Sequence, residues 1–226
     1  MNTKTLPKQF LELHGKPIII YTLEIFDRIE EIDGIVVVCV DGWHDYLRKM
    51  LKKFGIEKVR SIVSGGETGQ DSICNGIYAI AEQWPEDTTV LIHDGVRPLI
   101  DRETILNCID CVREKGNAIT VAPAVETVAI MGEEPGIVGQ VLERKRCGTA
   151  KAPQCFVLRD LLQAEHRAEK EDRHDFIDTA SMMSTYGHTL YSVEGKSINI
   201  KITNPTDFYI FRAISDAMEN SQIFGI

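Results

Sequence analysis

The strongest constraint on the fold is an unbroken apolar run, Gly34 to Val40, which reads GIVVVCV. A strand with β-branched residues on both faces must be covered on both faces, as in a parallel sheet between two layers of helices. Helix-like and strand-like patterns then alternate along the chain. This alternation predicts an α/β fold with βαβ units, namely a Rossmann-like, mostly parallel, doubly wound sheet.

The expected elements follow from hydrophobic spacing and from glycines placed to end helices. We expect helices at 11–29, 44–54, 70–84, 102–115, 158–168, 178–186 and 204–218, and strands at 34–40, 59–63, 88–93, 118–122, 190–193 and 198–202. Residues 126–149 mix short β-like pieces with several glycines, which indicates an extended β-arm over about 124–152. We therefore expect one domain, 1–226, with this arm inserted in it.

The composition excludes several classes of protein. A net charge of −9 argues against a general nucleic-acid binder, which would normally be basic. No stretch approaches the roughly 18 consecutive apolar residues of a membrane span, and the N-terminus has no signal-peptide core. Among six cysteines, Cys108 and Cys111 form a lone C-x-x-C without a second zinc-ligand pair, so we expect reduced thiols that are buried or half-buried. We expect a cytoplasmic protein with neither nucleic acid nor membrane as its partner.

Three segments are expected at the carboxyl ends of strands, where ligands bind in open α/β sheets. The first, Ser64 to Ser72, follows a strand and opens a helix with Gly65 and Gly66. Glycines there let backbone N–H groups approach an anion or a polar ring edge at the helix N-terminus. The alternative is an ordinary glycine-rich turn capped by Asp71 or Ser72.

The second segment is His93 to Pro98, which reads HDGVRP. Asp94, at the end of a buried strand, is placed to hold a divalent cation against phosphates; the alternative is a carboxylate that caps the loop. For Arg97 an ion pair with Asp94 or another acid is favoured over ligand contact. His93 is expected to be a packed residue at the strand end rather than a general base.

The third segment is Asn199 to Thr203, where Lys201 interrupts an alternating apolar pattern. A buried lysine needs a phosphate or a carboxylate as a partner, because an unpaired buried charge is costly. The alternative is an outward-facing lysine on the solvent side of a strand. Near the N-terminus, Lys8 stands before a helix-like segment and would be a good anion ligand.

Five motifs in order resemble one family of enzymes. They are LPKQF at 6–10 with GKP at 15–17, GG at 65–66 with DS at 71–72 and NG at 75–76, HD at 93–94 with RP at 97–98, PQ at 153–154, and NIKIT at 199–203. Together they resemble the cytidylyltransferases of 2-C-methyl-D-erythritol 4-phosphate and of ribitol 5-phosphate. The resemblance implies a Rossmann-like sheet with a β-arm that is exchanged in a homodimer.

The resemblance also implies roles for particular residues, listed here by their positions in this chain. Lys8 and Lys201 would be catalytic, Gly65, Gly66, Glu67, Ser72 and Asp94 would bind CTP, Asp94 would bind Mg²⁺, and Arg144 and Lys201 would hold the acceptor phosphate. The implied reaction is attack of an acceptor phosphate oxygen on the α-phosphorus of CTP, with pyrophosphate as the leaving group. Such catalysis consists mainly of positioning and charge stabilisation.

The chain departs from the family pattern in four places. The family begins with a strand and a glycine-rich loop that carries an arginine, and Met1 would be the last residue of that loop. Gly69 stands where arginine is usual, Ala152 where threonine is usual, and Glu67 where aspartate is common. From these departures we expect the 226-residue chain to be poorly active or inactive.

Three hypotheses about function follow. The leading one is a Mg²⁺-dependent cytidylyltransferase that releases pyrophosphate and makes a CDP-alcohol. Val96 and Trp43 look more like the ribitol branch, so ribitol 5-phosphate is favoured slightly over 2-C-methyl-D-erythritol 4-phosphate as the acceptor. The alternatives are a non-catalytic nucleotide-binding or dimerisation module, and a nucleotidyltransferase for another sugar phosphate or nucleotide.

Overall fold

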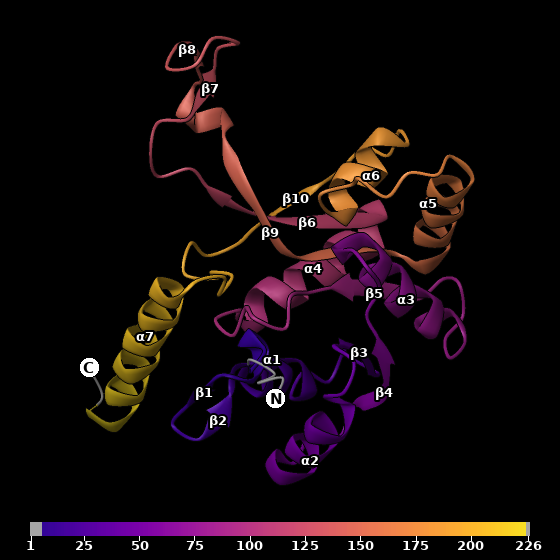
Figure 1. The fold of residues 1–226 in the computed structure, drawn as a ribbon, viewed down its shortest axis with the longest axis vertical. Coiled ribbons are helices and arrows are strands. Elements are labelled where there is room, and N and C mark those ends of the chain that lie inside the picture. Colours follow the sequence, from indigo (N-terminus) through magenta and orange to yellow (C-terminus); the bar gives the residue numbers. More distant parts are fainter. Residues whose placement is uncertain (1–5, 225–226) are drawn as a thin grey trace, which may run out of the picture.

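A computed structural model describes residues 6–224 (Figure 1). Its strands are β1 (Glu12–Leu13), β2 (Lys16–Pro17), β3 (Ile35–Cys39), β4 (Val59–Ser64), β5 (Thr89–Ile92), β6 (Asn117–Pro123), β7 (Ala129–Met131), β8 (Val138–Val141), β9 (Gly148–Val157) and β10 (Ser192–Glu194). Its helices are α1 (Ile18–Asp27), α2 (His44–Phe54), α3 (Gly69–Ala81), α4 (Arg102–Lys115), α5 (Leu158–Lys170), α6 (Thr179–Thr185) and α7 (Pro205–Phe224), with short 3₁₀ turns η1 (Lys8–Phe10) and η2 (Arg144–Arg146). The prediction for Met1 lies outside the described residues.

The predicted alternation of strands and helices is confirmed, but the main sheet is mixed rather than mostly parallel. Its strand order is β10-β6-β9-β5, and β9 runs antiparallel to both of its neighbours. The reason lies in the connection: the chain leaves β6, forms the arm and returns directly beside β6, and such a return gives an antiparallel pair. Only the β10–β6 pair in this sheet is parallel.

The apolar run that opened the sequence analysis forms β3, which pairs in parallel with β4. Both of its faces are covered, as predicted. Val37 and Cys39 pack in a cluster with side chains of α1 and α2, whereas Val38 faces Gly76 of α3. An unbroken apolar pattern was therefore needed to satisfy two layers at once.

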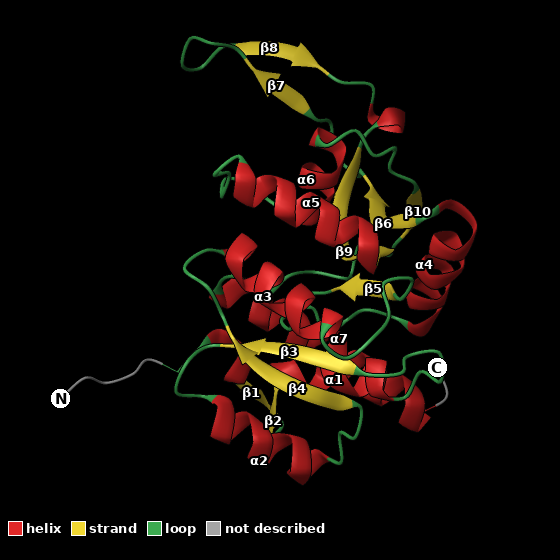
Figure 2. Ribbon diagram, turned by 90° about the vertical axis from the view of Figure 1, so that its right-hand side faces the viewer, coloured by secondary structure: helices red, strands yellow, loops and turns green. Residues whose placement is uncertain are grey.

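Helices cover both faces of the four-stranded sheet (Figure 2). On one face, Ile77 of α3, Leu161 of α5 and Met182 of α6 share a buried cluster with strand residues. On the other face, Cys108 and Val112 of α4 pack against side chains of β6, β9 and β10. Helices thus cover both faces of this sheet, as expected for an α/β fold, although the strand directions are mixed.

Glycines end two of the helices as the sequence predicted. Gly55 after α2 and Gly116 after α4 adopt left-handed φ values of 67° and 87°. At the start of α4, the Asp101 carboxylate accepts a hydrogen bond from the Thr104 N–H. These signals lie within a few residues of the helix ends, and both helices have the predicted bounds.

Two predicted elements are wrong. The helix expected at 11–29 begins only at Ile18, because His14 and Gly15 adopt positive φ and form a tight turn between β1 and β2. The strand expected at 198–202 is absent from the described structure. Ile200 and Ile202 instead pack with α7 residues such as Phe211, while the preceding Asn199 carbonyl oxygen accepts hydrogen bonds from the side chains of Arg97 and Lys151.

The arm is a separate two-stranded sheet of β7 and β8 that projects from the rest of the molecule (Figure 1). Both strands lie within the predicted range 124–152, and β9 pairs with β6 from Gly148 onward. All six cysteines are free thiols, with Cys39, Cys108 and Cys155 buried, as predicted. Among the described residues, no helix combines the length and apolar character needed to cross a membrane.

Candidate active site

The structure brings two of the predicted segments together at the carboxyl end of β5. The Lys201 ammonium lies 2.6 Å from Oδ1 of Asp94, and Nε of Arg97 donates to Oδ2 of the same carboxylate at 2.8 Å. The Lys201 side chain remains 43% exposed, whereas that of Arg97 is 12% exposed. The lysine in the apolar pattern is thus explained by a carboxylate partner, and its ammonium is still accessible to a ligand.

The two cations govern the charge of Asp94. Burial by itself would raise the pKa of this carboxyl, but the hydrogen bonds from Lys201 and Arg97 outweigh burial and lower it. Asp94 is therefore ionised at neutral pH. A fixed negative charge held between two positive ones suits a site that must accept either a metal ion or further anions.

His93 is a packed residue at the strand end, as predicted. Its ring lies 5.0 Å from that of Phe26, and Nε2 lies 3.3 Å from the Arg97 carbonyl oxygen. Burial lowers the pKa of His93 to about 4, so the ring is neutral at pH 7. A base this weak that is also buried does not fit proton abstraction near neutral pH.

The sequence analysis missed Lys151, which lies beside this cluster on β9. Its ammonium donates to the carbonyl oxygens of Ser197 at 3.2 Å and Asn199 at 3.1 Å. Nη1 of Arg97 donates to the same Asn199 oxygen at 3.0 Å. A lysine that precedes the mostly apolar segment 152–157, APQCFV, was a usable signal, similar to the one that singled out Lys201.

The glycine-rich segment forms a tight turn before α3. The Gly66 N–H donates to Oγ of Ser72 at 3.0 Å, and Ser72 Oγ donates to the Thr68 carbonyl oxygen. A Cβ on Gly66 would lie 2.2 Å from Cβ of Asp71, so only glycine fits there. The helix cap is Thr68, in a reciprocal capping box with Asp71. Glu67 is exposed.

Two predicted site residues are not joined to this cluster. Lys8 is exposed on η1, and within residues 6–224 its ammonium makes no ion pair or hydrogen bond. Arg144 lies on η2 at the base of the arm, where Nη1 donates to the Val125 carbonyl oxygen at 3.4 Å. Their roles, and those of the other predicted ligands, stay predictions.

The donor set fits a metal ion only in part. Over the described range, no group of three His, Cys, Asp or Glu side chains is arranged to hold a metal ion. Asp94 is therefore a single protein carboxylate, with both oxygens already hydrogen-bonded. One carboxylate suffices for Mg²⁺ when substrate phosphates supply further oxygen ligands.

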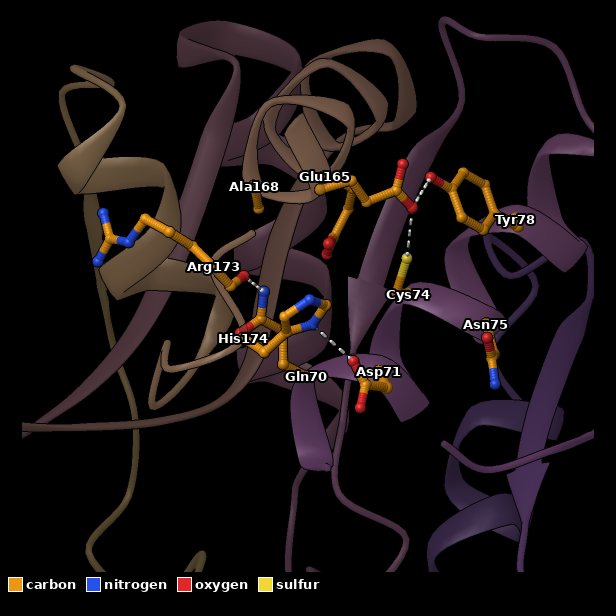
Figure 3. Close-up of a pocket in the computed structure, with 10 residues that line it drawn as sticks. Gln70, Asp71, Cys74, Asn75, Tyr78, Glu165, Ala168, Arg173 and His174 are labelled. Atoms are coloured by element: carbon orange, nitrogen blue, oxygen red, sulfur yellow. Dashed lines mark hydrogen bonds and ion pairs between the residues drawn. The ribbon is translucent and has the colours of Figure 1, made fainter. Parts of the chain in front are cut away.

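A cavity of about 170 Å³ lies elsewhere, between α3 and α5 (Figure 3). None of the predicted site residues lines it. Its polar side chains are largely paired: His174 lies 3.2 Å from Asp71, and the Tyr78 hydroxyl donates to Glu169 at 2.6 Å. Glu165 also lines it, is only 2% exposed, and has a pKa raised by burial to about 7. The cavity therefore differs in chemistry from the cation-rich cluster at Asp94.

Comparison with known proteins matches the chain to one family. The family model described as IspD: 2-C-methyl-D-erythritol 4-phosphate cytidylyltransferase matches residues 1–216. The chain is 51% identical to a ribitol-5-phosphate cytidylyltransferase of Vibrio parahaemolyticus, over 100% of this chain and 94% of the relative. It is 36% identical to a 2-C-methyl-D-erythritol 4-phosphate cytidylyltransferase of Clostridium novyi, over 92% and 87%.

Solved structures give the same result. The 4-diphosphocytidyl-2C-methyl-D-erythritol synthase of Anaerococcus prevotii superposes with a TM-score of 0.82 at 25% identity, covering 92% of this chain and 93% of that one. The 2-C-methyl-D-erythritol 4-phosphate cytidylyltransferase of Francisella tularensis superposes with a TM-score of 0.75 at 26% identity, covering 90% and 91%. The mixed α/β architecture is thus the architecture of these enzymes.

Proposed function

Because this chain belongs to the IspD family of cytidylyltransferases, it is a nucleotidyltransferase that acts on a polyol phosphate, and we propose that its acceptor is ribitol 5-phosphate. This choice rests on sequence identity, because relatives named for ribitol 5-phosphate are 51% and 49% identical to this chain over its whole length. The second candidate is 2-C-methyl-D-erythritol 4-phosphate, for which the family model and a relative at 36% are named.

The cluster at Asp94 supports a chemistry of positioning and charge. An oxygen of the acceptor phosphate attacks the α-phosphorus of CTP, forming a P–O bond as the bond to pyrophosphate breaks. The nucleophile is already anionic, so no strong base is needed, which agrees with the neutral, buried His93. Lys201 and Arg97 lower the repulsion between the two substrates, and Lys8 and the turn at Gly65–Ser72 would hold CTP.

Asp94 would be the protein ligand of Mg²⁺, with the remaining ligands supplied by CTP phosphates and water. When bound, the ion would neutralise phosphate charge as pyrophosphate leaves. The part of this chain is to hold Asp94 ionised and in place through the two hydrogen bonds from Lys201 and Arg97.

We also propose a homodimer formed through the arm. Large apolar side chains on β7, β8 and the loop between them are more than half exposed. They are Ile130, Met131, Ile137, Val138 and Val141. Such a patch of exposed apolar surface is typical of an interface with a partner. A second copy of the chain would cover them. Such a partner would also bring Arg144 near an acceptor site from which it is separate in one chain.

The proposed function is tested by incubating the protein with CTP, Mg²⁺ and each polyol phosphate, and measuring pyrophosphate release. The departures at Gly69 and Ala152 predict slow turnover, and we expect its kcat/KM to be at least tenfold higher with ribitol 5-phosphate than with 2-C-methyl-D-erythritol 4-phosphate. The Lys201→Ala variant is the matched control, and it should raise the acceptor KM and lower kcat. The reverse preference identifies the second candidate, and CTP binding without turnover identifies a non-catalytic homologue.

A further inference from the structure

Lys151 lies in the middle of β9, next to Ala152, and is half-buried. Its ammonium donates to two neutral carbonyl oxygens, those of Ser197 and Asn199. An ammonium has three N–H groups, so one remains for another acceptor. Within the described residues, no carboxylate oxygen lies within 4 Å of Nζ.

Another cation faces this lysine. Lys151 and Arg97 donate to the same carbonyl oxygen of Asn199, so their charged groups are at most two hydrogen-bond lengths apart. Burial, and then the charge of Arg97, lower the pKa of Lys151. Both effects disfavour the positive charge of Lys151, and an added anion would offset them.

The charges around Asp94 do not balance. Lys201, Arg97 and Lys151 are linked through Asp94 and the Asn199 carbonyl oxygen, and they carry three positive charges against one carboxylate. The Asn199 side chain holds this arrangement by donating to the Ala152 carbonyl oxygen at 2.8 Å. The excess of two positive charges matches a phosphate monoester, which carries close to two negative charges at neutral pH.

We propose that Lys151 is a further binding residue for the phosphate group of the acceptor, beside Lys201. This inference rests on the proposed function, because it assigns the phosphate subsite to the acceptor. The next residue, Ala152, has a methyl side chain and cannot donate a hydrogen bond to a phosphate. In this chain the group beside position 152 that can do so is the ammonium of Lys151. An ammonium is also a stronger partner for a phosphate oxygen than a hydroxyl is.

The test compares Lys151→Gln with Lys151→Arg and with the control Lys196→Gln, whose lysine lies in the loop that Lys151 contacts but pairs with Asp101. We expect Lys151→Gln to raise the acceptor KM at least tenfold while the KM for CTP changes less than twofold. Lys151→Arg should restore most of the affinity, and the control should leave both values unchanged. An unchanged acceptor KM in Lys151→Gln, or an equal rise for CTP, overturns the proposal.

A binding measurement separates this inference from the proposed function. Calorimetry with inorganic phosphate and with ribitol 5-phosphate needs no turnover. Weaker binding of both by Lys151→Gln than by the wild type supports the phosphate subsite even if no polyol phosphate is ever converted. Equal binding by both proteins, or no phosphate binding by the wild type, refutes the subsite whatever the enzyme's activity.

Discussion

Two carboxyl groups in partly buried surroundings, those of Asp94 and Glu165, have pKa values shifted in opposite directions. The neighbouring side chains determine the direction of each shift. Asp94 is held ionised by Lys201 and Arg97. Glu165, on the cavity wall between α3 and α5, pairs with no cation among residues 6–220, and the charges of Glu169 and Asp71 add to the effect of burial in raising its pKa to about 7. The first environment fits a phosphate site, whereas the second works against folding whenever the carboxyl is ionised.

This difference predicts a pH-dependent stability. A carboxyl whose pKa is 4.5 unfolded and about 7 folded binds more protons in the folded state between those values, so stability falls as pH rises through this window. At pH 8, Glu165→Gln should therefore raise the free energy of unfolding by up to about 3 kcal/mol, since the pKa rises from 4.5 to about 7 and one pKa unit is about 1.4 kcal/mol. Near pH 4 the variant should match the wild type. Urea unfolding at both pH values measures the effect.

The exposed Glu86→Gln variant is the control and should change neither value. A Glu165→Gln protein that is equally stable to the wild type at pH 8 would show that the Glu165 carboxylate carries no penalty when ionised.

At the scale of elements, the turn between β4 and α3 shows why a tight turn requires residues without a Cβ atom. Gly65 has Oγ of Ser72 near its Cβ position, and Gly66 has Cβ of Asp71 even closer. The close approach lets Thr68 and Asp71 cap α3 reciprocally. The same turn is predicted to hold the cytidine part of CTP, so its shape links helix stability to nucleotide binding.

We therefore predict that Gly66→Ala lowers the free energy of unfolding by about 1–3 kcal/mol, the usual cost of an added methyl group in a packed site. It should also raise the KM for CTP several-fold, because Asp71 must shift. Thermal unfolding and steady-state kinetics measure both effects. Gly69→Ala is the control, since a Cβ there meets nothing within 4 Å. Equal effects of the two substitutions would contradict this account of the turn.

At the scale of the molecule, the arm sets the expected assembly. β7 and β8 leave the doubly wound body and expose apolar side chains on a sheet of only two strands, which is marginal in isolation (Figure 1). The proposed acceptor site has Lys201 and Lys151 from the body, whereas Arg144 lies on η2 at the base of the arm. A dimer formed through the arm would cover the exposed apolar side chains and would also bring Arg144 close to the lysines of the partner.

We predict that the wild-type chain sediments as a dimer and that Val141→Asp, on β8, shifts it to monomer at micromolar concentration. The introduced charge would have to be buried in the interface, which is costly. The acceptor KM should rise with dissociation if Arg144 acts from the partner. Tyr209→Asp on α7, which is 66% exposed in the wild type, should leave the dimer intact. A wild-type chain that sediments as a monomer would exclude the arm interface.

The sequence determined what depends on neighbouring residues. The apolar run at 34–40 determined a strand covered on both faces, and Gly55 and Gly116 determined where two helices end. Asp94 was predicted as a site residue because a carboxylate ends a buried strand, and Lys201 because a lysine in an apolar pattern needs a partner. Each of these signals lies within one element, so no knowledge of the rest of the chain was needed.

Only the tertiary structure decided which distant groups share an environment. The antiparallel direction of β9 follows from how the arm returns, and the loss of the strand at 198–202 follows from packing against α7. Lys151 joins Arg97 only because the Asn199 carbonyl oxygen lies between two segments that are far apart in sequence. Charge balance and burial are properties of a neighbourhood in space, so local pattern identified the separate ligands and folding determined the site that they form.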